Sequence, residues 1–225
     1  MQAVILAAGK GTRMGDLTKD TPKPLLKIGE KTILEHNLSE LPDETDEVII
    51  VVGYFREQIK KLIGESYRGK KIIYVEQKEL NGTAGALLLC KDLLRGRFLM
   101  MYGDDLYNGR DLEKLIKYPL AILVTQLKEN RGEHASPAIV KLNDAGELLD
   151  IVERQEVKEG MLVNTGAYVL NEDYFKYPMV VAGRPAGEYG VPQTFLQMVR
   201  DGAKFAVVPA EKWLKITAPE DLLEK

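Results

Sequence analysis

Residues 6–26 read LAAGKGTRMGDLTKDTPKPLL, and this stretch decides the fold of the chain. It follows the apolar run Ala3-Val4-Ile5-Leu6, a pattern typical of a buried first strand. Small residues and two glycines come next, and such a backbone can turn tightly and direct its N–H groups at one anion. Arg13 and Lys23 add positive charge, and a proline on each side of Lys23 predicts an extended segment there. The stretch therefore predicts a phosphate-binding loop after the first strand.

Two common phosphate loops are excluded by spacing. The P-loop needs Gly, four residues, then Gly-Lys-Ser/Thr, and the chain has no such string. The dinucleotide fingerprint needs a third glycine where Met14 stands, and the second strand ends in Gly53-Tyr54 without an acid for a ribose. Two glycines alone would favour an ordinary turn between strand and helix. Arg13 and Lys23 at these spacings favour phosphate binding instead.

The run LAAG-K-GTRM, followed by LT and TPKPLL, resembles the signature of the sugar-1-phosphate nucleotidyltransferases. Members of that family join a nucleoside triphosphate to a sugar 1-phosphate and release pyrophosphate. A signature of this length is far more specific than a short motif. Loop chemistry and resemblance together predict Arg13 and Lys23 as catalytic residues, and nucleotide contacts from Leu6, Ala7, Ala8, Gly9, Gly11 and Thr12.

Composition narrows the class of protein. The 225 residues are 45% hydrophobic, enough for one sizeable open α/β domain. The balance of 31 basic against 34 acidic residues argues against a nucleic-acid or membrane-surface protein. A single cysteine, Cys90, excludes an internal disulfide and fits a reducing compartment. With no membrane-length apolar run and no leader, we expect a soluble cytoplasmic protein, and a homo-oligomer is left open.

The first half of the sequence alternates strand and helix patterns. Such alternation predicts a doubly wound, mostly parallel, Rossmann-like sheet, in which ligands lie beyond the carboxyl ends of the strands. The glycine loop, Gln77 and Asp104 all follow expected strands, so we expect them to share one site. The expected strands are 47–52, 71–77 and 97–102, and the expected helices are 31–41, 55–63 and 84–94.

The second half has a different pattern. An Asp144-Ala145-Gly146 turn between two β-rich runs predicts a hairpin. We expect a mixed extension of the sheet within one domain, residues 1–225, of the nucleotide-diphospho-sugar transferase type. Residues from about 1 to 120 would form the nucleotide-binding half, and residues from about 121 to 225 the sugar-binding half. The expected strands are 121–127, 138–142, 148–153, 162–170 and 204–208, with helix at 194–200 and 220–223.

Gln77, Gly82 and Thr83 are candidate contacts to the base of a nucleotide. A glutamine amide offers both a donor and an acceptor to one edge of a base, and Gly82 allows close backbone approach. Without further context this is a helix start with Thr83 as its N-cap. In the family that the chain resembles, glutamine and glycine at this spacing read the base. The resemblance implies UTP or dTTP.

Asp104 is the candidate metal ligand. It follows the expected strand 97–102 and a glycine, a position that suits Mg²⁺, which prefers oxygen ligands and substrate phosphates. A plain surface turn is the alternative, because Gly-Asp-Asp is typical of turns. The resemblance implies that Asp104 ligates Mg²⁺ and that Asp105 shapes the loop.

Candidate contacts to a sugar phosphate come from the second half. The resemblance implies that Glu153 accepts hydrogen bonds from sugar hydroxyls and that Arg154 holds the phosphate where the family usually has lysine. Asn164-Thr165 stands where the family has Asn-Ala before a glycine. Ala138 replaces a glycine that family members often have beside the sugar, and its methyl group would narrow the pocket.

Lys215 is the sharpest departure from the family pattern. Residues 213–222 read WLKITAPEDL and match the family, except that Lys215 stands where a second metal-binding aspartate belongs. A charged lysine cannot ligate Mg²⁺. We predict that its ammonium faces the phosphates and replaces part of the metal's charge. Weak Mg²⁺ binding by Asp104 alone, or loss of catalysis, are the other outcomes.

The resemblance implies a nucleotidyltransferase that needs no covalent intermediate. The sugar 1-phosphate oxygen attacks the α-phosphorus in line and pyrophosphate leaves, so positioning and electrostatics do most of the work. One alternative is a cytidylyltransferase acting on phosphocholine or an inositol phosphate. Another is a protein that binds nucleotide sugars without turnover.

Overall fold

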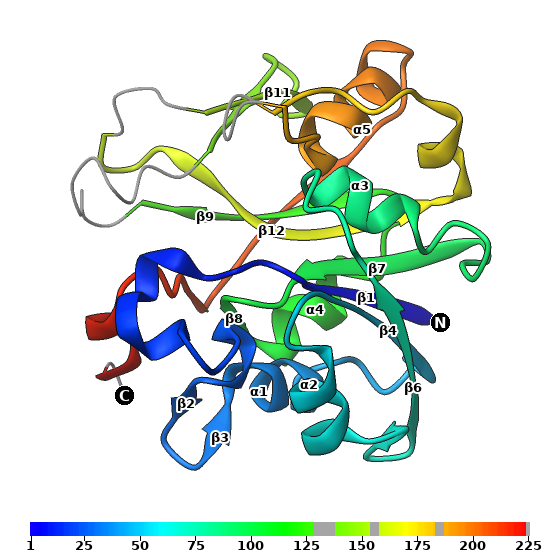
Figure 1. Ribbon diagram of the computed structural model, residues 1–225. Helices are drawn as coiled ribbons and strands as arrows, with labels where there is room; N and C mark the ends of the chain where they lie inside the picture. Colours follow the sequence, from blue (N-terminus) through cyan, green and yellow to red (C-terminus); the bar gives the residue numbers. More distant parts are fainter. Residues whose placement is uncertain (128–137, 154–157, 183–186, 224–225) are drawn as a thin grey trace.

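The computed structural model describes residues 1–127, 138–153, 158–182 and 187–223, and within them a ten-stranded mixed sheet forms the centre (Figure 1). The main path of strands runs β11-β10-β12-β7-β1-β4-β6-β5, while β9 pairs with both β12 and β13. The strands are β1 (Gln2–Ala7), β4 (Glu47–Val52), β5 (Ser66–Tyr67), β6 (Lys70–Glu76), β7 (Arg97–Tyr102), β9 (Ala121–Gln126), β10 (Ile139–Leu142), β11 (Leu148–Val152), β12 (Leu162–Asn171) and β13 (Ala206–Pro209).

Helices cover both faces of this sheet. The helices α1 (Ile33–Ser39), α2 (Arg56–Ile63) and α4 (Gly109–Leu115) lie on one face, and α3 (Thr83–Leu88) and α5 (Val191–Arg200) on the other (Figure 1). Each face has its own apolar core: one contains residues of α1, α2 and α4, and the other residues of α3 and α5. The predicted doubly wound arrangement is confirmed.

Double coverage explains why the central strands are apolar at every position. In β1, Val4 and Leu6 pack into one core, while Ala3, Ile5 and Ala7 pack into the other. Successive side chains of a strand point to opposite faces, so a strand covered on both sides must be continuously apolar. Strands β7, β1, β4 and β6 are parallel neighbours, and their carboxyl ends therefore lie along one edge.

Two small sheets lie beside the main one. The strands β2 (Lys27–Ile28) and β3 (Lys31–Thr32) form a hairpin, and β8 (Leu106–Tyr107) pairs with β14 (Trp213–Leu214). The second pairing brings the C-terminal segment back to the end of β7, although it lies about a hundred residues later in the chain. Short 3₁₀ segments cover Thr12–Thr18, Lys23–Leu25, Glu172–Lys176 and Pro219–Leu223.

Several local predictions need correction. Lys23 begins a 3₁₀ turn, Lys23–Leu25, and does not lie on an extended segment. The backbone is extended at Pro22, directly before this turn. The helix expected at 84–94 ends at Leu88, and the one expected at 31–41 covers Ile33–Ser39, where Thr32 and Glu35 form a capping box. The strands expected at 47–52 and 97–102 have the predicted bounds. Among the described residues, no helix has the length and apolarity to span a membrane.

The second half continues the same sheet. The predicted hairpin is confirmed as β10 and β11, with Gly146 in its turn. Strand β12 pairs with β7 of the first half and with β9 of the second, so no linker separates the two halves. The chain is a single α/β domain.

Gly166, in the middle of β12, generates a stability prediction. Its φ is +84°, and a Cβ there would lie 2.3 Å from the ring of Tyr102. Gly146 is the matched control, since its φ is +77° but a Cβ would meet nothing within 4 Å. Gly146→Ala should lose about 1–2 kcal/mol of unfolding free energy from backbone strain alone.

Gly166→Ala should lose roughly 1–3 kcal/mol more, because the added methyl group overpacks the site against Tyr102. Denaturant unfolding of both variants measures this difference. Equal losses of unfolding free energy in the two variants would show that the Tyr102 ring leaves room for the added methyl group.

Candidate active site

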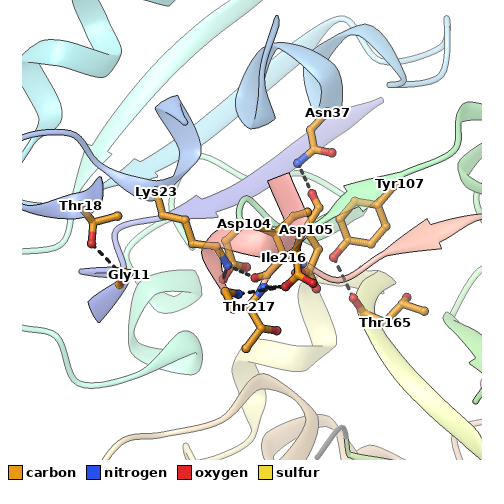
Figure 2. A network of polar contacts seen from close by, with 12 residues as sticks. Gly11, Thr18, Lys23, Asn37, Asp104, Asp105, Tyr107, Thr165, Ile216 and Thr217 are labelled. Carbon is orange, nitrogen blue, oxygen red and sulfur yellow. Dashed lines mark hydrogen bonds and ion pairs between the residues drawn. The ribbon is translucent and has the colours of Figure 1, made fainter. Parts of the chain in front are cut away.

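A buried lysine is the centre of the candidate site. The side chain of Lys23 is almost entirely buried, and its Nζ donates to Asp104 Oδ2 at 2.8 Å and to the carbonyl oxygen of Ile216 (Figure 2). A buried ammonium is stable only with such partners. An ammonium has three donors, and these two acceptors use two of them. The contacts join the first loop, the end of β7 and the C-terminal segment.

Asp105 holds the other side of the same C-terminal segment. Its Oδ1 accepts from the backbone N–H of Ile216 at 3.0 Å, and its backbone carbonyl accepts from Asn37 Nδ2 at 2.8 Å (Figure 2). Burial, and then the neighbouring charge of Asp104, raise the pKa of Asp105 to about 7, although Lys23 opposes this shift. The inward direction of Asp105 agrees with its predicted role in shaping the loop. Asp104 is the more exposed carboxylate of the two.

The glycine loop packs directly against Lys23. Gly11 has a φ of +64°, and a Cβ there would lie 2.8 Å from the Cβ of Lys23. The carbonyl oxygen of Gly11 accepts from the Thr18 hydroxyl at 3.0 Å and from the Met14 N–H at 2.9 Å. Only a glycine fits this position, because a larger residue would overlap the side chain of Lys23. The glycine loop and Lys23 are therefore packed together as one unit. Arg13, in contrast, has an exposed side chain on the 3₁₀ segment.

Lys215 lies in the same cluster of charges. It connects β14 to Ile216, the residue that Lys23 and Asp105 hold. Burial is the largest cause that lowers the pKa of Lys215. The charges of Arg13 and Lys23 lower it too, and the charges of Asp105 and Asp104 oppose the change. All four charges are therefore near enough to act on its ammonium.

Gln77, Gly82 and Thr83 form a second group. The Nε2 of Gln77 donates to Asn81 Oδ1 and to the carbonyl of Gly82, both at 3.1 Å. Gly82 has a φ of +99°, and a Cβ there would clash with the backbone of Tyr189. The prediction of Thr83 as an N-cap is wrong: Gly82 is the N-cap, and the Thr83 hydroxyl accepts from the N–H of Val191 at 3.0 Å.

Residues predicted to contact the sugar phosphate form a third group. Asn164 Nδ2 donates to the Tyr168 hydroxyl at 2.6 Å, and its backbone N–H donates to Ala138 at 2.9 Å. Glu153 Oε1 accepts from Gln193 Nε2 at 3.0 Å. Arg154 lies outside the described residues.

Thr165 belongs to the same stretch of β12 as Asn164, but its side chain points inward. It is fully buried, its hydroxyl donates to the carbonyl of Leu123 at 2.8 Å, and its own carbonyl accepts from Tyr107 at 2.8 Å (Figure 2). These contacts give Thr165 a structural role, since they hold the part of β12 that carries Asn164.

Tyr102, which sequence reasoning missed, links the three groups. Its ring has an edge-to-face contact with Tyr168, with centroids 6.3 Å apart. Thr83 and the charges of Asp104 and Glu153 all influence the pKa of its hydroxyl. Burial, the largest cause, raises the pKa of Tyr102 to about 12, so it stays neutral. Its position at the end of β7, directly before Gly103-Asp104, is the sequence feature that could have indicated a place in the site.

A metal site made by the protein alone has little support. Over the described ranges, no three His, Cys, Asp or Glu side chains gather in a way that could hold an ion. Asp104 offers one accessible carboxylate, and Lys23 already binds one of its oxygens. This donor set suits a hard cation that takes its other ligands from phosphate and water.

The fold and the site define a class of α/β proteins that bind ligands at the carboxyl edge of a parallel sheet. A family model described as nucleotidyl transferase matches residues 2–225. The chain therefore belongs to the nucleotidyl transferase family, and the resemblance drawn from residues 6–26 is confirmed.

Individual relatives agree with the family. A UTP–glucose-1-phosphate uridylyltransferase, AglF, of Haloferax volcanii is 34% identical over 98% of this chain and 93% of its own length. The bifunctional protein GlmU of Methanocaldococcus jannaschii is 30% identical over the whole chain, which spans about half of that relative (53%). The solved structure of a UDP-glucose pyrophosphorylase complexed with UDP-glucose has a TM-score of 0.81 at 18% identity, over 99% of this chain and 95% of that one, and shows the shared fold.

Proposed function

We propose that this protein transfers a nucleoside monophosphate from UTP or dTTP to a sugar 1-phosphate and releases pyrophosphate. The observation that best supports this proposal is the ion pair between Lys23 and Asp104 beneath the glycine loop. It positions an ammonium group where the phosphates would lie. The activity for which the Haloferax volcanii uridylyltransferase is named, at 34% identity over nearly the whole of both chains, supports a sugar 1-phosphate as acceptor.

The reaction needs charge and position rather than a protein nucleophile. The sugar phosphate oxygen attacks the α-phosphorus in line, the bond from that phosphorus to the bridging oxygen breaks, and pyrophosphate carries away the electron pair. Lys23 gives its third donor to the α-phosphoryl group. Arg13 and the backbone N–H groups of the glycine loop stabilise the leaving pyrophosphate. Residues from about 1 to 120 hold the nucleotide, and residues from about 121 hold the sugar, with Lys215 returning to the phosphates.

Mg²⁺ is the metal that we propose for this site. Asp104 would supply the protein's carboxylate, and a bound triphosphate would supply further oxygens. When bound, the ion neutralises part of the negative charge on the phosphates. Glu153, which follows β11 and accepts from Gln193, and Asn164 on β12 would face the sugar. The single buried cysteine fits the reducing cytoplasm that we propose as the compartment.

Gln77 underlies the proposed choice of base. Its NH₂ group already donates to Asn81 and Gly82, so a base meets the amide oxygen first. An acceptor at this position suits the N3–H donor of uracil or thymine.

Pyrophosphate release from a panel of triphosphates and sugar 1-phosphates tests the proposal. We expect UTP or dTTP to react faster than ATP and GTP, because Gln77 meets the edge of a pyrimidine. CTP with phosphocholine or inositol phosphate belongs in the panel, since the cytidylyltransferase alternative predicts turnover there. A purine preference would contradict the role of Gln77, and binding without any release would favour the non-catalytic alternative.

Arg13→Ala and Lys23→Ala should each slow turnover by roughly 10²–10³-fold, about 3–4 kcal/mol, by analogy with the loss of one preorganised donor. Lys19→Ala is the matched control, because Lys19 is an exposed lysine of the same segment that pairs with Asp16. Thermal melting must accompany the Lys23 variant, which leaves Asp104 and the Ile216 carbonyl without their cation. Near-parental rates in both folded variants would make the loop merely structural.

Lys215 is tested by two substitutions. Lys215→Ala should lose activity, because a cation at the phosphates is gone, and Lys215→Asp should raise the affinity for Mg²⁺ by adding a carboxylate near Asp104. Calorimetric Mg²⁺ titration of the parent and both variants measures the metal affinity directly, apart from turnover. A fully active Lys215→Ala protein would show that the ammonium does not face the phosphates.

A further inference from the structure

We propose that Tyr54 stacks against the base of the bound nucleoside triphosphate, an inference that rests on the proposed function. Tyr54 follows β4 and is 90% exposed, the largest fraction among the exposed large hydrophobic residues of the described chain. Its ring has an edge-to-face contact with Phe55, with centroids 5.1 Å apart. Single exposed aromatic residues are common on protein surfaces, so the position of Tyr54 must carry the argument.

Strand order places Tyr54 between the two candidate nucleotide-binding segments. β4 lies between β1 and β6, parallel to both, with Val52 opposite Ala7 on one side and Glu76 on the other. β1 continues into the glycine loop, and β6 continues into Gln77. A nucleotide that touches both segments must therefore cross the carboxyl end of β4, where Gly53 and Tyr54 lie.

Close contacts fix this turn to both neighbours. A Cβ at Gly53 would lie 2.5 Å from the carbonyl oxygen of Ala8, so the turn packs against the start of the glycine loop. On the other side, the N–H of Gln77 donates to Val52 at 2.9 Å, and Arg56 forms an ion pair with Glu76. Tyr54 is thus an exposed ring on an anchored turn.

The chemistry of a base complements this arrangement. A base presents hydrogen-bonding groups at its edge and an apolar π-surface on each face. Gln77 can meet the edge, and an aromatic ring can meet the face, a pairing that proteins use widely because it tolerates every base. Tyr54 would add affinity for the nucleoside, and Gln77 would select among bases.

Calorimetric titration with two ligands separates base from phosphate binding. Tyr54→Ala should weaken UTP binding about 5- to 50-fold, in line with the loss of one stacking contact. Binding of inorganic tripolyphosphate, which has no base, should not change. Tyr54→Phe keeps the ring and should bind UTP as the parent does.

Tyr118→Ala is the matched control. Tyr118 is 45% exposed, but it lies at the opposite edge of the sheet, where its carbonyl accepts from Arg97 at the start of β7. This variant should bind both ligands like the parent.

A Tyr54→Trp protein offers a second readout by fluorescence. UTP should quench the fluorescence of the added tryptophan more than tripolyphosphate does. The parent, whose one tryptophan is Trp213, is the reference.

Three results would overturn the role of Tyr54: unchanged UTP affinity in Tyr54→Ala, an equal loss for both ligands, or a Tyr54→Phe protein as weak as Tyr54→Ala. Pyrophosphate release by the parent is measured separately. If the parent is active and Tyr54→Ala binds UTP normally, only the stacking inference fails. If the parent releases no pyrophosphate with any substrate pair, the proposed function fails, and the two titrations still decide whether Tyr54 meets a base.

Discussion

The buried ammonium of Lys23 is the interaction on which this structure depends. A charge removed from water needs strong partners, and Lys23 finds them in Asp104 and in the carbonyl of Ile216. Those partners come from the end of β7 and from the C-terminal segment, so one side chain holds together three regions that are distant in sequence. Gly11, against the Cβ of Lys23, fixes the glycine loop to the same point.

The same constraint places the positive charge of the site. Because Lys23 is held from both sides, its ammonium has little freedom, and a preorganised charge stabilises a developing charge better than a mobile one. Asp105 fixes the segment that carries Lys215 by accepting from the N–H of Ile216. Arg13 is the exposed one of the three cations Arg13, Lys23 and Lys215, and its charge acts on Lys215. The polar groups at this edge therefore suit a polyphosphate.

Features with strong local patterns could be predicted from the sequence. β4 and β7 have the predicted bounds because strands buried on both faces must be continuously apolar. The glycine loop and Asp104 could be placed at one edge because parallel strands end together. The family signature supplied the remaining candidate residues, and the family itself is confirmed.

Features that depend on distant contacts could not be predicted. Helix α4 starts at a glycine, and the buried carboxylate of Asp111 holds the backbone of Glu211 and Lys212, a hundred residues away. The strands β8 and β14 have two residues each and exist only through their mutual pairing. Thr83 resembles an N-cap in the sequence, yet its hydroxyl accepts a hydrogen bond from the N–H of Val191 in α5. Tyr102 has no motif of its own, and its role arises from the packing of β7 against β12.

A crystal structure of the chain with a UTP analogue that carries a methylene group between the α- and β-phosphorus atoms tests the central claim most directly. The account predicts that the phosphates lie over Gly9 and Gly11, with the nitrogens of Arg13 and Lys23 within hydrogen-bonding distance of their oxygens. A triphosphate bound elsewhere, or bound over the loop with the Lys23 ammonium turned away from it, would contradict the account.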